Sequence, residues 1–210
     1  MMTQKPLLLI PAAGFGRRVG QPPAKELLPD PSGRPLIERA LKQAQARGWP
    51  VHVITRDEKM GLIQFLRDFS GVEIQVQVIE PSREWPETVL KSRKYWRERN
   101  ILCLPDTVFS PEGVLDSLAS SKFPLAVAAF ETSEYSTWGV MKTKNSGIEI
   151  CEKPIEARSG MRAWGLISFE PFAGEKLFEA QLESTFDHQW KELPIGAEFF
   201  SLETFSDLTR

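Results

Sequence analysis

Short apolar runs alternate with longer segments of helical spacing along the first 130 residues of the chain. Residues 7–12, 51–55 and 125–130 are apolar at nearly every position, which is typical of parallel strands buried on both faces. Between them, residues 35–48 and 58–69 carry apolar side chains three or four positions apart, as amphipathic helices do. This alternation predicts a sheet with helices on both faces.

The remaining elements follow from the same reading of the pattern. Residues 72–79 alternate apolar and polar side chains, which predicts a strand covered on one face. A helix is expected at 86–99 and a short buried strand at 101–104, after which the regular alternation ends beyond residue 130. The other predicted elements are strands at 138–141, 148–151, 162–169 and 199–204 and a helix at 171–182.

These elements predict an α/β fold in one domain over residues 1–210. We expect a three-layer α/β/α architecture with a mostly parallel, Rossmann-like mixed sheet. The sequence has no linker, repeat or low-complexity segment that would divide the chain.

Composition and charge narrow the classes of partner. The chain has 210 residues and a net charge of −2, so its overall charge does not favour nucleic acid. No apolar run approaches the ~20 residues that a membrane span needs, and no signal peptide is recognised, so a cytoplasmic protein is expected. The two cysteines, Cys103 and Cys151, lie in apolar segments and are expected to be buried free thiols.

The first strand runs directly into a glycine-rich stretch that carries cations. Gly14 and Gly16 follow the strand, and Arg17, Arg18 and Lys25 come next. A phosphate chain is bound by backbone N–H groups, which glycine allows to approach closely, and by positive charge from arginine or lysine. This combination indicates a site for a nucleoside triphosphate.

A dinucleotide fingerprint is the alternative for the same stretch. The glycines fall at 14, 16 and 20, one residue away from the GxGxxG spacing. Pro22 and Pro23 would break the helix that begins inside a dinucleotide loop. The pattern therefore disfavours a nicotinamide-dependent enzyme, which stays only as the least favoured hypothesis for this chain.

Asp106 follows the short strand at 101–104, at the edge of the sheet where the glycine-rich stretch also lies. Ligands of open α/β sheets bind at these carboxyl ends, and a carboxylate there can hold Mg²⁺ against triphosphate oxygens. The side chain could equally cap the helix that follows it. Spacing alone leaves both roles open.

Several motifs together resemble the family of sugar-1-phosphate nucleotidyltransferases. Residues 13–18 (AGFGRR), 24–29 (AKELLP) and 33–37 (GRPLI) match the opening of that family. Residues 104–106 (LPD) and 152–154 (EKP) match its metal-binding and sugar-binding motifs. The opening is also similar to that of the methylerythritol-phosphate cytidylyltransferases, whereas the two later motifs favour the sugar-1-phosphate branch.

The resemblance implies an enzyme that transfers a nucleoside monophosphate from a nucleoside triphosphate to a sugar 1-phosphate, with Mg²⁺ as cofactor. It implies catalytic roles for Arg18, Lys25 and Asp106. The implied nucleotide-binding residues are Ala12, Ala13, Gly14, Gly16, Arg18, Lys25 and Asp106. The implied sugar-phosphate-binding residues are Gly139, Glu152, Lys153 and Gly165, and the implied metal ligands are Asp106 and Glu203.

Two segments depart from the family pattern. Residues 81–88 (PSREWPET) stand where the family reads the base with glycine, glutamine or small residues. Glu203 is the nearest match to the acid in the family motif W-x-D-T/I-G-T, but Phe205 replaces the glycine. These departures keep a second hypothesis open, a nucleotide-binding regulatory or partner protein on the same fold without turnover.

Overall fold

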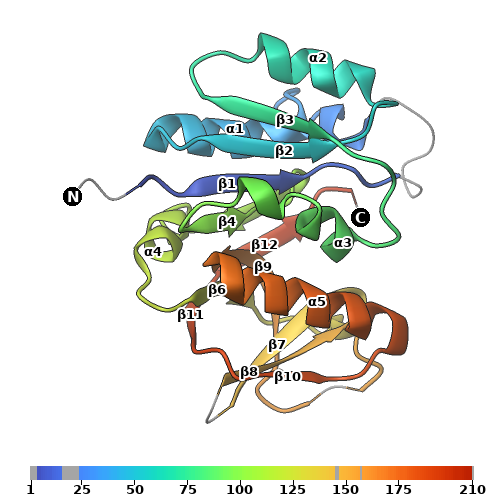
Figure 1. Cartoon of the computed structure of the whole chain (residues 1–210), viewed down its shortest axis with the longest axis vertical. Helices are drawn as coiled ribbons and strands as arrows, with labels where there is room; N and C mark the ends of the chain where they lie inside the picture. Colours follow the sequence, from blue (N-terminus) through green and yellow to red (C-terminus); the bar gives the residue numbers. More distant parts are fainter. Residues whose placement is uncertain (1–3, 16–23, 145–146, 157, 210) are drawn as a thin grey trace.

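The computed structural model describes residues 4–15, 24–144, 147–156 and 158–209 (Figure 1). Within them, β1 (Leu7–Pro11), β2 (Val51–Thr55) and β3 (Ile74–Val78) form a run of parallel strands, and β4 (Asn100–Leu102) pairs parallel with β1 on its other side. β1 is buried except at its last residue, and β2 is buried throughout, as expected for strands covered on both faces. The predicted parallel arrangement of this half is confirmed.

Helices cover both faces of the sheet. α1 (Leu36–Arg47), α2 (Met60–Asp68) and α4 (Val114–Ser120) pack on one face, against a core that includes Leu8 and Ile10 of β1. The opposite face carries the intervening Leu9, packed in a second core with side chains of the other two helices. These helices are α3 (Trp85–Leu90) and α5 (Pro171–Asp187). The three-layer α/β/α architecture is therefore confirmed.

None of the helices in the described residues is long and apolar enough to cross a membrane.

The second half of the sheet is largely antiparallel. β9 (Arg162–Phe169) pairs antiparallel with β4, with β6 (Leu125–Phe130) and with β7 (Gly139–Lys144). β7 and β8 (Gly147–Glu152) form an antiparallel pair, to which β10 (Lys191–Leu193) adds. The sheet is thus mixed, as predicted, with its parallel pairs concentrated in the N-terminal half and one further parallel pair between β6 and β11 (Ala197–Ser201).

The end of the chain differs from the prediction of one strand at 199–204. β11 ends at Ser201, and a second strand, β12 (Thr204–Asp207), begins three residues later. β12, labelled in Figure 1, does not belong to the main sheet and pairs antiparallel with β5 (Thr107–Ser110). In this pairing Asp207 lies opposite Thr107. Glu203 therefore lies between β11 and β12 and belongs to neither strand, whereas Asp207 is the last residue of β12.

The predicted helix at 86–99 is also wrong in its extent. α3 ends at Leu90, and only a short 3-10 turn, η2 (Arg93–Tyr95), follows. The Ser92 hydroxyl donates to the carbonyl of Val89 at 2.6 Å, a local bond that competes with helix continuation. The basic side chains of this segment therefore do not form one helical face.

Both cysteines are buried free thiols, as the sequence predicts. Burial, helped by the charge of Asp106, raises the pKa of the Cys103 thiol to about 12. Burial also raises the pKa of Cys151 above its ordinary value. Neither thiol has the low pKa that a nucleophilic cysteine needs.

Candidate functional site

A cavity of about 700 Å³ lies at the carboxyl ends of the parallel strands. Ala13 and Gly14, which follow β1, line it on one side, and the segment 104–106, which follows β4, lines it on another. The rest of its wall comes from the loop before α3, from β7, β8 and β9, and from the C-terminal segment. This is the edge of an α/β sheet at which ligands bind, as the sequence predicts.

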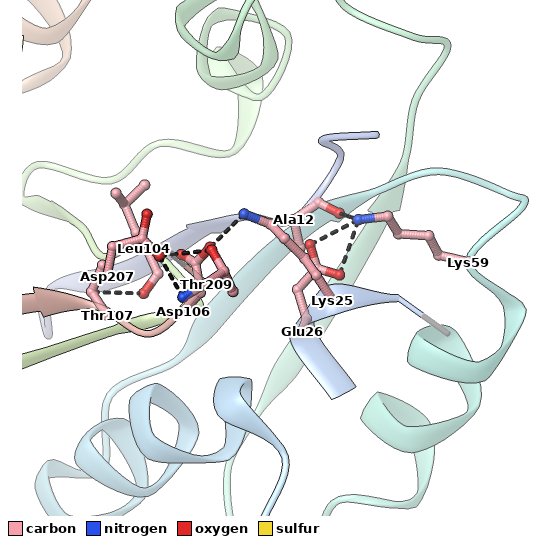
Figure 2. Close-up of polar contacts among 9 residues, drawn as sticks. All are labelled: Ala12, Lys25, Glu26, Lys59, Leu104, Asp106, Thr107, Asp207 and Thr209. Carbon is pink, nitrogen blue, oxygen red and sulfur yellow. Dashed lines mark hydrogen bonds and ion pairs between the residues drawn. The ribbon is translucent and has the colours of Figure 1, made fainter. Parts of the chain in front are cut away.

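One end of the cavity is built around Lys25 and Asp106. A 3-10 turn, η1 (Lys25–Leu27), carries Lys25, whose ammonium group forms an ion pair with the carboxylate of Asp106 (Figure 2). Asp106 is only 4% exposed, so its charge is held by these contacts rather than by bulk water. The structure thus brings together two residues that lie 81 positions apart in the sequence.

The C-terminal segment adds a second carboxylate to this end. The hydroxyl of Thr209 lies 2.7 Å from Oδ1 of Asp207 and 3.3 Å from Oδ2 of Asp106, within hydrogen-bond distance of both (Figure 2). The Thr209 backbone N–H donates to Asp207 Oδ1 at 2.8 Å, and the Leu208 N–H donates to the Asp106 carbonyl at 2.9 Å. Threonine therefore links the two aspartates, because β12 is paired with β5 next to Asp106.

Asp207 was missed in the sequence, where Glu203 is the candidate acid. Glu203 is exposed before β12 and is not among the residues that line the cavity, whereas Asp207 is. A usable signal is present, because Phe205 precedes Asp207 by two positions, as the tryptophan precedes the acid in W-x-D-T/I-G-T. Pairing of β12 with β5, which no local pattern reveals, brings this acid to the site.

The donor set at this end suits a magnesium ion. Asp106 and Asp207 offer carboxylate oxygens, the hard ligands that Mg²⁺ prefers. The described residues contain no group of three or more His, Cys, Asp or Glu side chains that could hold a metal by themselves. Mg²⁺ is commonly held by one or two carboxylates together with substrate phosphates and water, so two aspartates fit such an ion.

A second part of the cavity wall, which we refer to as its other end, lies at β8 and β9 and contains buried polar atoms without partners among the described residues. Glu152 is 5% exposed and Trp164 is 6% exposed, and both line the cavity. Within the described residues, Oε2 of Glu152 and Nε1 of Trp164 have no hydrogen-bond partner. A Cβ added at Gly139 would lie 2.2 Å from that indole nitrogen and 2.5 Å from that carboxylate oxygen. Glycine at 139 therefore keeps this space open.

The protonation of Glu152 reflects its surroundings. Burial raises the pKa of the Glu152 carboxyl to about 7, and the neighbouring charge of Lys153 opposes the rise. Lys153 also lines the cavity, with φ of 51°, a conformation that residues other than glycine adopt rarely. Its backbone N–H donates to the Trp138 carbonyl at 3.0 Å, which ties the end of β8 to the start of β7.

A side chain at Gly165 would project from the face of β9 opposite to the one that carries Trp164. A Cβ there would lie 2.6 Å from ring carbons of Phe205 and 2.8 Å from Leu202, both away from the cavity wall. Because side chains alternate along a strand, Trp164 takes the cavity-facing position instead. Gly165 is not among the residues that line the cavity, so its position does not support the expected place in the acceptor pocket. Trp164 is a second lining residue, besides Asp207, that the sequence did not predict.

The unusual segment 81–88, a loop that runs into the start of α3, forms part of the cavity wall. Ser82, Arg83, Glu84 and Trp85 line the cavity. The Trp85 ring lies 5.1 Å from the Trp164 ring, centroid to centroid, and it also packs on Phe178 of α5. An aromatic wall therefore stands beside the unpaired polar atoms of Glu152 and Trp164.

The glycine-rich stretch is described only in part. Ala13 and Gly14 line the cavity, and Ala12 is buried directly before them. Gly16 and Arg18, which the sequence places in the nucleotide site, lie outside the described residues.

Solved structures of low sequence identity share this fold. One is titled a putative glucose-1-phosphate thymidylyltransferase from Bacillus anthracis in complex with a sucrose, with a TM-score of 0.77 and 18% identity over 97% of this chain and 90% of that one. The inositol-1-phosphate CTP transferase from T. maritima has a TM-score of 0.71 and 14% identity, covering 99% of this chain and 90% of that one. UTP-bound UGPase from Acinetobacter baumannii has a TM-score of 0.71 and 16% identity, covering 98% and 89%.

No family model matches the sequence. No curated protein sequence matches it either. The structural likeness agrees with the resemblance seen in the sequence motifs and confirms it for the fold.

Proposed function

We propose that this chain is a nucleotidyltransferase that transfers a nucleoside monophosphate from a nucleoside triphosphate to a sugar 1-phosphate and releases pyrophosphate. One observation carries the proposal: a single cavity has a lysine with two aspartates at one end and buried, unpaired polar groups at the other. The first end suits a phosphate chain, and the second suits a hydroxylated acceptor. The shared fold supports the same class of reaction.

At the charged end, the protein positions the triphosphate and offsets its charge. Asp106 and Asp207 would hold Mg²⁺, which when bound neutralises phosphate oxygens and orients them. Lys25 would offset negative charge at the α-phosphate, and Arg18, from the resemblance, would contact the leaving pyrophosphate. An oxygen of the acceptor phosphate attacks the α-phosphorus in line, and the bond from that phosphorus to the bridging oxygen of pyrophosphate breaks.

At the other end, which we call the acceptor end, the protein orients the acceptor. A sugar hydroxyl can donate to Oε2 of Glu152 and accept from Nε1 of Trp164, which satisfies both buried atoms at once. Lys153 would hold the acceptor phosphate. The apolar faces of a sugar ring pack well against indole rings such as that of Trp85.

The test is pyrophosphate release with Mg²⁺, each common nucleoside triphosphate and a panel of sugar 1-phosphates. We expect release with one pair of substrates, abolished in Lys25→Ala and retained in Lys42→Ala, which changes an exposed lysine on α1. A sugar without the phosphate is the matched acceptor control and should give no release. Silence with every pair would contradict the proposed transfer.

The aromatic loop favours a second candidate, a nucleotide-binding regulatory protein. Arg83, Glu84 and Trp85 occupy part of the cavity wall where the family usually has small residues. Calorimetry separates the two candidates, because a regulatory protein would bind a triphosphate with Mg²⁺ and release no pyrophosphate with any acceptor.

A further inference from the structure

A buried ion pair lies behind the charged end of the cavity. Lys59, at the start of α2, is 9% exposed, and its partner Glu26 is fully buried. The Lys59 ammonium group donates to the two carboxylate oxygens of Glu26 at 2.8 and 3.0 Å. It also donates to the carbonyl of Ala12 at 2.7 Å (Figure 2). The three N–H groups of the Lys59 ammonium group thus have three acceptors.

These contacts fasten two segments that supply the phosphate site. Ala12 directly follows β1 and precedes Ala13 and Gly14 of the cavity wall. Glu26 directly follows Lys25 in η1, and the two side chains extend in opposite directions, Lys25 to Asp106 and Glu26 to Lys59 (Figure 2). A displacement of Glu26 would therefore displace Lys25 from the cavity.

The energetics of the pair favour a positional role over a stabilising one. Burial lowers the pKa of Lys59, and the charge of Glu26 opposes that change. The attraction between two buried charges is largely offset by the cost of removing them from water, so an apolar pair of similar size is often at least as stable. What an apolar pair cannot provide is directed hydrogen bonds to a backbone carbonyl and to a carboxylate.

We propose that Lys59 is a positioning residue for nucleotidyl transfer. Its bond to the Ala12 carbonyl fixes the position of the backbone that follows β1. Its bonds to Glu26 fix the position of η1, the turn that carries Lys25. Lys59 acts through Lys25 and the glycine-rich stretch and does not touch the substrate. This inference rests on the proposed function.

The test removes both charges together, in Lys59→Met/Glu26→Gln, because Lys59→Met alone would leave a buried carboxylate unpaired and could unfold the chain. We expect the double variant to fold with a lower melting temperature than wild type, because the side chain at position 26 and the Ala12 carbonyl lose a buried partner. We expect it to lose about 10- to 100-fold in kcat/KM, the range seen when a group that orients a metal ligand is removed. The matched control is Lys191→Met/Asp187→Asn, which removes a partly exposed ion pair outside the cavity lining and should leave the rate unchanged.

Epistasis with Lys25 separates positioning from general damage. In a Lys25→Ala background, we expect Lys59→Met/Glu26→Gln to cost much less than it does in wild type, because the group that it positions is already gone. Equal fold losses in the two backgrounds, or a wild-type rate in the double variant, would overturn the proposal.

Binding of inorganic triphosphate with Mg²⁺, measured by calorimetry, gives a readout independent of turnover. We expect wild type to bind and Lys59→Met/Glu26→Gln to bind several-fold more weakly. This result would support the positioning role even if no acceptor gave pyrophosphate release, which would count against the proposed transfer alone. Equal affinity in a folded double variant would refute positioning of the phosphate site.

Discussion

The two ends of the cavity satisfy their polar groups in opposite ways. At the charged end, Asp106 is bound by Lys25, and the hydroxyl of Thr209 lies within hydrogen-bond distance of both Asp106 and Asp207. At the acceptor end, polar atoms of Glu152 and Trp164 are buried and have no hydrogen-bond partner within the described residues. One end is held in place by the protein itself, and the other leaves hydrogen bonds to be made.

This difference assigns different tasks to the two ends. A preorganised cluster of charges acts on a phosphate chain whatever base or sugar is attached to it. Buried polar atoms without partners are costly, and a ligand that satisfies them is preferred over one that does not. We therefore expect the reaction rate to depend on the charged end and the choice of acceptor to depend on the acceptor end.

The largest effect should come from removing the cation of the charged end. Lys25→Ala should lower kcat by about 10²- to 10³-fold, because one preorganised contact to the reacting phosphate is lost. Acceptor KM should change little, and Lys42→Ala should match wild type in steady-state kinetics. A loss confined to acceptor KM would break the proposed division between the two ends.

The acceptor end should reveal itself in the pH dependence of stability. The pKa of Glu152 is about 7 in the folded protein and about 4.5 when unfolded, so the folded form binds the proton more tightly between these values. Stability from this group is full below about pH 4.5 and is lost as pH rises through about 7, by on the order of 3 kcal/mol.

Denaturant unfolding of wild type and Glu152→Gln between pH 4 and about 8 checks this expectation. The difference between the two proteins should shift in favour of the variant as pH rises. Glu179→Gln, an exposed change on α5, should follow wild type at every pH. Parallel curves for wild type and Glu152→Gln would mean that the Glu152 carboxyl ionises normally.

The two candidate acids of the C-terminal segment give a matched pair. Asp207→Asn should lower kcat by about 10²-fold, because the proposed Mg²⁺ site would lose one of its two carboxylates, and should raise the Mg²⁺ concentration needed for half-maximal rate. Glu203→Gln should change neither quantity, because Glu203 is exposed and outside the cavity wall. A loss of rate in Glu203→Gln but not in Asp207→Asn would instead support Glu203 as the metal ligand, as predicted from the sequence.

Local pattern was sufficient for one half of the molecule and insufficient for the other. The apolar runs of β1 and β2 and the stripe of α1 predicted the parallel layer, because buried strands and amphipathic helices have distinct periods. The pairing of β12 with β5 was not predictable in this way, since it joins segments about a hundred residues apart. The spacing from Phe205 to Asp207 was a usable local signal for this acid, but only the pairing shows that Asp207 lies next to Asp106.

The candidate site shows the same limit at the level of single residues. Lys25, Asp106, Glu152 and Lys153 were named from their motifs, and the structure brings all four to one cavity. Trp164 was missed, because the register of β9 decides which of two neighbouring residues faces the cavity. Register is set by pairing with β6 and β7 rather than by the identity of the residues themselves.

The smallest predicted effect tests the acceptor end most specifically. Trp164→Phe keeps a smaller aromatic ring beside Trp85 and removes the indole N–H, so it should lower kcat/KM for the acceptor by about 2- to 10-fold, the worth of one neutral hydrogen bond. KM for the triphosphate should stay unchanged, as should both constants in Trp190→Phe, which lies outside the cavity wall. An acceptor that lacks the hydroxyl bound by Trp164 should lose this sensitivity to the substitution. Equal losses for both substrates would instead mean that Trp164 supports the whole cavity, and the separation of its two ends would fail.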